Sequence, residues 1–212
     1  MTISIKDLVG LFTKSPPPTY TGENGLHTSA ADIAAVEYIA GAANCFTMTT
    51  YATTANLLTY VRLVAPPYPS TLVQLAVEVT AAGTGGSTGR IALYDNADAH
   101  EGRLSYVEQI LPWRLLADSG DLAIDSTGLK TYACSVALEP GRSYWVAFMA
   151  SASVTLRAVN ILAISGMGWS VNTNALSLMR VPFTYAAFPA VAPIPTLQIT
   201  AASPPAMRYK LS

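Results

Sequence analysis

Four stretches in the middle of the chain decide its fold. They are Arg90-Ile91-Ala92-Leu93-Tyr94-Asp95, Leu115-Leu116-Ala117-Asp118-Ser119-Gly120, Ser126-Thr127-Gly128-Leu129-Lys130-Thr131 and Glu139-Pro140-Gly141-Arg142-Ser143-Tyr144-Trp145-Val146-Ala147. Each joins a short apolar run to Gly, Pro, Asp or Ser, a pattern that is typical of short strands connected by tight turns. The sequence therefore predicts an all-β protein built as an antiparallel β-sandwich.

The pattern continues on both sides of these stretches. Apolar and polar residues alternate well in 75–79 and 131–138, which indicates strands with one buried face and one exposed face. Short strands with turn signals between them favour a jelly-roll-like sandwich. We predict strands at residues 46–51, 57–64, 72–79, 90–94, 114–117, 122–124, 130–138, 144–150, 154–159, 178–185, 197–201 and 208–211.

One helix is predicted, at residues 29–41. Ser29 is a suitable N-cap, Asp32 is an acid in the first turn, and Gly41 is a suitable stop. Within this segment, Val36-Glu37-Tyr38-Ile39 is equally compatible with a strand.

The four stretches resemble a β-sandwich domain that is common in the fibres, spikes and decorations of tailed bacteriophages. The resemblance rests on the LYD strand end, the LLADSG loop, the STG turn followed by Lys130 and Thr131, and the Pro-Gly hairpin that leads into YWVA, and it covers residues 72–158. It implies a protein of the virion that assembles as a homo-oligomer, a trimer or another cyclic form, and contacts other capsid or tail proteins.

Composition limits the remaining classes. Charged residues make up 12% and hydrophobic residues 51% of the chain, whereas about 25% of a soluble domain is charged. We therefore expect part of the surface to be buried against other subunits. A net charge of −1 without a basic stripe argues against nucleic-acid binding. No apolar run reaches the length of a membrane helix, and charges near the first residues argue against a secretory signal.

The chain divides into three predicted parts: an attachment arm at 1–28, the β-sandwich at 29–185, and a Pro-rich C-terminal tail at 186–212 that packs on the sandwich or on a partner. We expect partner contacts from an apolar patch and a polyproline spacer in the arm. A further contact is expected from one glycine-flanked tryptophan in the sandwich part. These predicted partner contacts are Ile3, Ile5, Leu8, Val9, Phe12, Pro16, Pro17, Pro18 and Trp169.

No catalytic, cofactor or metal site is predicted. The Gly-rich segment 83–89 joins two strands and has no Lys, so it indicates a hairpin tip and not a phosphate loop. Most of the acids between Asp95 and Glu139 fall in predicted turns, where carboxylates usually bind the backbone. The loop from Asp95 to Glu101, with Asp98 and His100, matches no EF-hand, and a divalent ion there stays an open alternative. Cys45 and Cys134 are expected to be free thiols.

The sequence thus favours a non-enzymatic bacteriophage virion protein, a capsid decoration, spike or fibre-base component that assembles through its arm. The alternative is a tail-fibre receptor-binding protein that recognises a host surface glycan. A bacterial carbohydrate-binding module is disfavoured, because an exported module needs a signal peptide.

Overall fold

The fold is all-β. A computed structural model describes residues 21–22, 25–26, 38–40, 48–97, 111–160, 178–193, 198–200 and 203–212. Every strand pair in these residues is antiparallel, and these residues contain no helix. It follows that the described part of the chain has no helix that could cross a bilayer.

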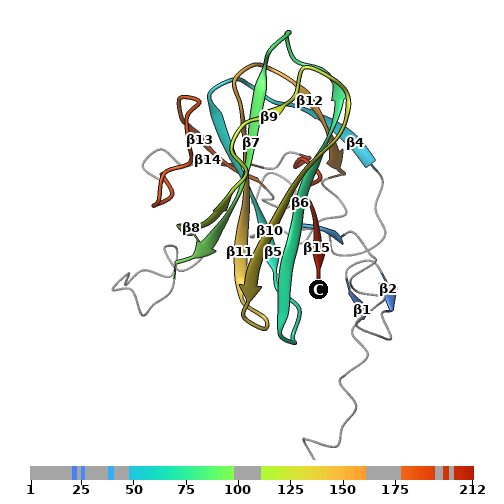
Figure 1. Ribbon diagram of the computed structural model, residues 1–212, viewed down its shortest axis with the longest axis vertical. Helices are drawn as coiled ribbons and strands as arrows, with labels where there is room; N and C mark the ends of the chain where they lie inside the picture. The colour runs from blue at the N-terminus through green and yellow to red at the C-terminus, as the bar shows by residue number, and fades with distance from the viewer. Residues whose placement is uncertain are drawn as a thin grey trace, which may run out of the picture.

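Two sheets pack face to face (Figure 1). The six-stranded sheet consists of β3 (Tyr38–Ile39), β4 (Met48–Ala52), β6 (Ser70–Ala81), β10 (Gly128–Leu138), β12 (Thr155–Val159) and β15 (Arg208–Leu211). The seven-stranded sheet consists of β5 (Leu57–Val64), β7 (Thr88–Asn96), β8 (Pro112–Asp118), β9 (Leu122–Ala123), β11 (Ser143–Ala150), β13 (Leu178–Pro182) and β14 (Gln198–Thr200). A separate pair, β1 (Thr21–Gly22) and β2 (Gly25–Leu26), precedes them.

The strand order is that of a jelly roll. In the six-stranded sheet β4, β12, β6 and β10 lie in that order, and in the seven-stranded sheet the order is β5, β11, β7 and β8. The chain crosses to the opposite sheet at each step from β4 to β7 and again from β9 to β13. The additional strands β15 and β9 lie end to end with β12 and β8, beside β6 and β7 respectively. This confirms the predicted sandwich and its jelly-roll character.

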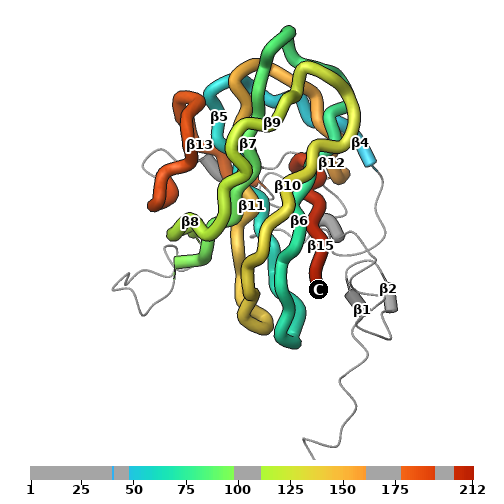
Figure 2. The backbone as a smooth tube through the Cα atoms, viewed as in Figure 1, coloured from blue at the N-terminus to red at the C-terminus, as the bar shows by residue number. Residues whose placement is uncertain are grey.

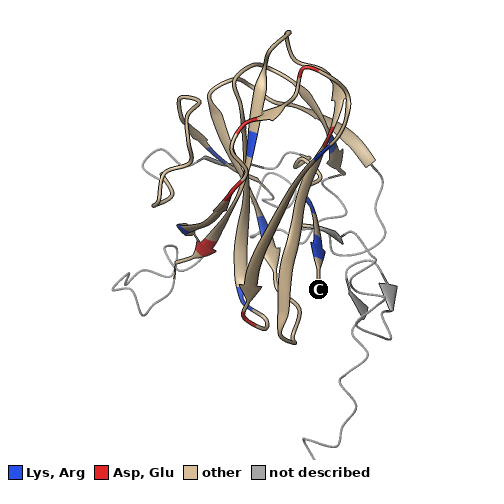
Figure 3. Cartoon of the chain, viewed as in Figure 1, with Lys and Arg blue, Asp and Glu red and all other residues tan. Residues whose placement is uncertain are grey.

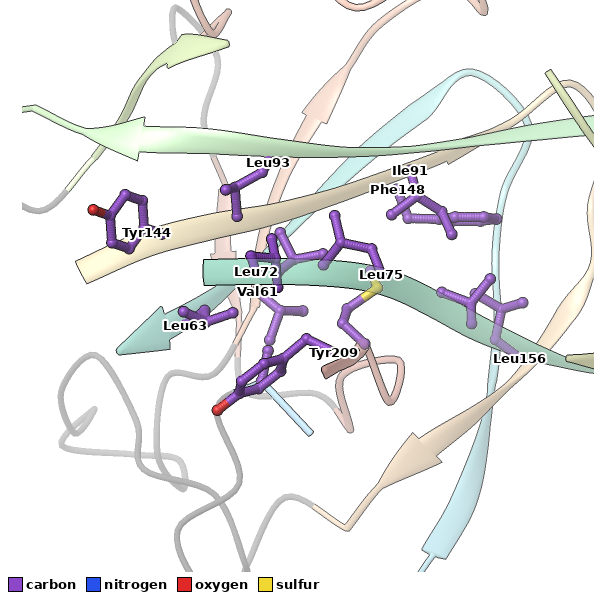
Figure 4. Close-up of a cluster of buried hydrophobic side chains, with 14 of the residues drawn as sticks. Val61, Leu63, Leu72, Leu75, Ile91, Leu93, Tyr144, Phe148, Leu156 and Tyr209 are labelled. Atoms are coloured by element: carbon purple, nitrogen blue, oxygen red, sulfur yellow. The ribbon is translucent and has the colours of Figure 1, made fainter. Parts of the chain in front are cut away.

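The main core fills the space between the sheets (Figure 4). Leu75, Val77 and Val79 of β6 point inward at every second position, as strand geometry requires. They meet Ile91 of β7 and Phe148 of β11, both fully buried. Each such side chain contributes about 1.5–3 kcal/mol by leaving water, so the alternation in the sequence is what holds the two sheets together.

A second core lies on the outer face of the seven-stranded sheet. Tyr60, Tyr94 and Trp145 are fully buried there, although their strands already use the opposite face for the main core. Residues 183–193, which we call the strap, contribute Phe188 and Ala192 to this second core. The ring of Phe188 meets Tyr94 edge to face at 6.1 Å. The seven-stranded sheet is therefore buried on both faces, which accounts for part of the low charge content.

The strap also covers the outer edge of β8. The backbone N–H of Leu115 donates to Ala190 at 3.0 Å, and the N–H of Ala192 donates to Trp113 at 2.8 Å. Arg114 and Val191 form the antiparallel bridge between these two bonds. Figure 2 shows the strap in orange, running from β13 toward β8. The Pro-rich segment after residue 185 thus closes an exposed sheet edge with the chain's own backbone.

Most predicted strands are confirmed within a few residues of their observed ends, and 57–64 coincides with β5. The strand predicted at 178–185 is too long, because β13 ends at Pro182, where the strap begins. The helix predicted at 29–41 is wrong where the structure describes it: Tyr38 pairs with Tyr209 and Ile39 with Arg208 in an antiparallel ladder. Within the predicted arm, Gly22 pairs with Gly25 in the short ladder of β1 and β2.

A test of the main core uses Gly89→Ala. A Cβ at Gly89 would lie 3.0 Å from Ile124 and 3.1 Å from Phe148, so we expect the free energy of unfolding to fall by about 1–3 kcal/mol through overpacking. Chemical denaturation measures the difference. The matched control is Gly85→Ala, because a Cβ at Gly85 meets no atom within 4 Å. Equal stability of both variants would contradict this packing.

Candidate assembly surface

The residues predicted to contact partners lie outside the described part of the chain. This applies to Ile3, Ile5, Leu8, Val9, Phe12, Pro16, Pro17, Pro18 and Trp169. Their role therefore stays a prediction. Among the described residues, the features that bear on assembly are the charged clusters and the open sheet edges. Figure 3 shows how sparse charged residues are on both sheets.

The first charged cluster is centred on Arg90 of β7. Its guanidinium binds Asp118 through Nη2 at 2.8 Å and Nε at 3.3 Å, and it binds Asp121 through Nη1 at 2.9 Å. The hydrogen bonds to Asp118 raise the pKa of Arg90 above its usual value. Asp118 also accepts from the backbone N–H of Gly120, and Tyr185 donates its hydroxyl proton to Asp121 at 2.8 Å. The cluster ties β7, the turn after β8 and the strap together.

Burial raises the pKa of Tyr185 to about 12. The phenol therefore stays protonated throughout the neutral range and remains the donor in its bond to Asp121. This hydrogen bond fixes the start of the strap to the seven-stranded sheet.

The second cluster lies at the opposite end of the sandwich. Arg142, in the turn between β10 and β11, binds both carboxylate oxygens of Asp95 at 2.9 Å and one oxygen of Glu139 at 3.0 Å. The backbone N–H of Glu139 donates to the hydroxyl of Tyr144. The paired geometry of Arg142 and Asp95 is the strong form of a charge-assisted bond, and it fixes the end of β7 to the hairpin.

The third cluster lies on the outer face of the six-stranded sheet. Glu78 of β6 accepts from Arg157 of β12 at 3.0 Å and from Arg208 of β15 at 2.9 Å. The hydrogen bond from Arg157 lowers the pKa of Glu78. Since β12 and β15 lie end to end beside β6, one carboxylate joins two strands along that line. It adds to the backbone bridge between Ala158 of β12 and Pro205, just before β15.

These contacts show what the acids of the described residues do. Asp95, Asp118, Asp121, Glu139 and Glu78 all bind arginine. Asp125 accepts from the backbone N–H of Gly86, at the tip of the predicted Gly-rich hairpin. Of the acids and histidine in the loop from Asp95 to Glu101, where a divalent ion was an open alternative, only Asp95 lies in the described residues. No group of three metal-binding side chains occurs within the described ranges. Each of these carboxylates thus has an arginine or backbone partner within the fold.

Trp145 of β11 is buried and donates from Nε1 to Oδ1 of Asn96 at 3.0 Å. Cys134 is a free thiol whose pKa is raised by burial, and its sulfur lies 3.6 Å from the carbonyl oxygen of Leu72. Cys45 lies outside the described residues.

One open edge of the sandwich is the outer side of β10 (Gly128–Leu138), which we call the β10 edge. Among the described strands β10 pairs only with β6, along one of its two sides. Its outward side chains are all exposed and uncharged, namely Leu129, Thr131, Ala133, Ser135 and Ala137. Its inward side chains Tyr132, Cys134 and Val136 are only half-buried, although they contact the main core.

The alternation in 131–138 predicted this division into two faces. It gave no sign that the strand lies at an edge, because strand order is set by contacts between segments far apart in the sequence. No protein-family model matches the chain, and no similar protein was found among curated proteins. The β10 edge is therefore defined by geometry and residue chemistry alone.

The Arg90 cluster allows two similar carboxylates to be compared. As turn residues bound only to the backbone, Asp118→Asn and Asp121→Asn would each cost about 1 kcal/mol or less. The structure separates them: the Asp118 side chain is 19% exposed and that of Asp121 is 55% exposed. We now expect Asp118→Asn to lower the free energy of unfolding by about 2 kcal/mol, because a charge-assisted pair is lost. Asp121→Asn should still cost about 1 kcal/mol or less.

Chemical denaturation of both variants measures these changes. Equal costs would show that Arg90 does not depend on Asp118. Incubation with capsular polysaccharide or lipopolysaccharide, followed by an assay for new reducing ends, tests the same residues for catalysis. Sugar release by the parent that disappears in either variant would identify a catalytic carboxylate.

Proposed function

We propose that the chain is a non-enzymatic structural protein of a tailed-bacteriophage virion, a capsid decoration, spike or fibre-base component that works as an oligomer. The observation that carries this proposal is the use of the acids. Each of the carboxylates Glu78, Asp95, Asp118, Asp121, Asp125 and Glu139 has a partner within the fold. Glycoside hydrolysis needs two acids that face a substrate, whereas a scaffold needs acids that join its strands.

The fold supports the same proposal less specifically. Jelly rolls occur in viral capsid domains and also in lectins, so the fold alone is compatible both with a particle component and with the receptor-binding alternative. The LYD, LLADSG and YWVA stretches resemble β-sandwich domains of tailed bacteriophages. This resemblance favours a component of the virion under both alternatives, decoration and receptor binding. The uncharged β10 edge favours assembly, since an open strand of this kind on a monomer invites association.

The first test is the oligomeric state. We expect sedimentation velocity of the purified chain to show a stable oligomer at micromolar concentration, a trimer or another closed form, because the low charge and the open edge need covering. Mixing with purified capsid or tail proteins then locates it: co-sedimentation with the capsid protein supports decoration. A soluble monomer that binds neither would overturn the proposal, and a monomer that binds host glycan would favour the receptor-binding alternative.

The second test concerns the predicted arm. Deletion of residues 1–25 should leave a folded β-rich domain, because every described residue of the two cores follows this segment. We expect circular dichroism and the thermal midpoint to be retained while incorporation into particles is lost. A truncated chain that is unfolded would place the arm in the core and contradict its role in attachment.

A further inference from the structure

We propose that two copies of this chain pair through β10, in antiparallel orientation about a two-fold axis, so that their six-stranded sheets become one continuous sheet. This inference deepens the proposed function, because it rests on an oligomeric protein and names the contact that joins two copies. The occupant of the β10 edge is thus a second β10.

The first argument is the contrast between two edges of the same sandwich. The outer side of β8 is closed by the strap, which supplies backbone partners to Trp113 and Leu115. The outer side of β10 has no strand partner in the described ranges, although the strand runs over Gly128–Leu138. Figure 1 shows β10 at the front with β6 along one side. A long strand with unpaired backbone groups is a template for another strand.

The second argument is the incomplete cover of the core. On β6 the inward side chains Leu75 and Val77 are at most 1% exposed. On the neighbouring β10 the inward side chains Tyr132, Cys134 and Val136 remain half-buried. A further strand beside β10 would extend the sheet over these side chains and remove apolar surface from water.

The third argument is the distribution of charge along β10. It favours a second β10 strand in antiparallel over parallel orientation. Lys130 is the sole charged residue of β10 and lies near one end of the strand. In a parallel pair the two lysines would face each other. In an antiparallel pair centred on Ala133, Lys130 faces Val136 of the second copy, and the two lysines are separated by roughly 20 Å. That distance is beyond the screening length of physiological salt, so two β10 strands meet without repulsion.

The same register matches the outward face. Thr131 then lies opposite Ser135 of the second copy, Leu129 opposite Ala137, and Ala133 opposite itself. Small or uncharged side chains therefore meet at every outward position. A shift in the register between β10 and β6 lies between Ala133 and Val136, yet exposed and half-buried side chains continue to alternate through it.

A charge-swap experiment on the full chain tests this pairing. Thr131→Lys with Ser135→Lys places lysine opposite lysine in the proposed register, and we expect dimerisation measured by sedimentation to weaken at least about tenfold. Thr131→Glu with Ser135→Glu should do the same. An equimolar mixture of the two variants should recover the dimer, because each lysine then faces a glutamate. Both positions are exposed, so circular dichroism should be unchanged.

The matched control adds two lysines elsewhere. Ala52→Lys with Thr54→Lys changes exposed positions at the end of β4, away from β10, and should leave the dimer intact. Cysteine cross-linking fixes the register: in a chain with Cys45→Ser and Cys134→Ser, Ala133→Cys should form an intermolecular disulfide on oxidation. Ala137→Cys, which faces Leu129 of the second copy, should not, since a disulfide needs Cα atoms less than about 7 Å apart.

The outcomes separate this inference from the proposed function. An oligomer that both charged variants retain, or that cross-links equally at Ala137→Cys, overturns pairing through β10 and leaves the oligomeric virion protein standing. A chain that is monomeric before any substitution overturns both. Loss of the dimer in each charged variant with recovery in the mixture supports the pairing.

Discussion

The structure depends on one constraint: the seven-stranded sheet is apolar on both faces. One face packs against the six-stranded sheet, and this packing forms the sandwich. The other face holds Tyr60, Tyr94 and Trp145 and needs a second cover, which the strap provides through Phe188 and Ala192. A sheet buried on both sides leaves few outward positions for charged side chains. The Arg90 cluster then holds the strap to the sheet edge, because Asp118 and Asp121 bind Arg90 while Tyr185 binds Asp121.

Much of this fold was predictable from the sequence, since alternation and turn residues act over short distances. Residues 131–138 show the period of a strand, and Asp118-Ser119-Gly120 forms the expected turn with Gly120 at a φ of 66°. The helix prediction at 29–41 failed at Tyr38 and Ile39 because local preference does not register the ladder that β15 offers them. The role of the strap was predictable only in outline. Its prolines are incompatible with a central strand, but they do not indicate which face of the sandwich the segment covers.

The candidate surface was less predictable, for a physical reason. The low content of charged residues indicated burial against other subunits. Part of this low content instead reflects the second core, which the strap covers within one chain. Whether a strand lies in the centre of a sheet or at its edge depends on neighbours far away in the sequence. β10 alternates between exposed and half-buried side chains, and β7 is buried along most of its length. Neither pattern shows that, among the described strands, β7 pairs on both sides and β10 on one side only. The sequence therefore predicts that such a face exists and not that it stays open.

The position of β15 at the end of the chain affects how the protein folds. Arg208 of β15 and its partner Glu78 of β6 are 130 residues apart in the sequence. The jelly-roll order likewise pairs strands that are mostly not neighbours along the chain. Proteins dominated by such distant contacts fold slowly, because a long loop must close before the contact stabilises anything. Until β15 arrives, part of one side of β6 lacks its strand, so newly made chains are exposed to premature association and we expect slow maturation in the cell.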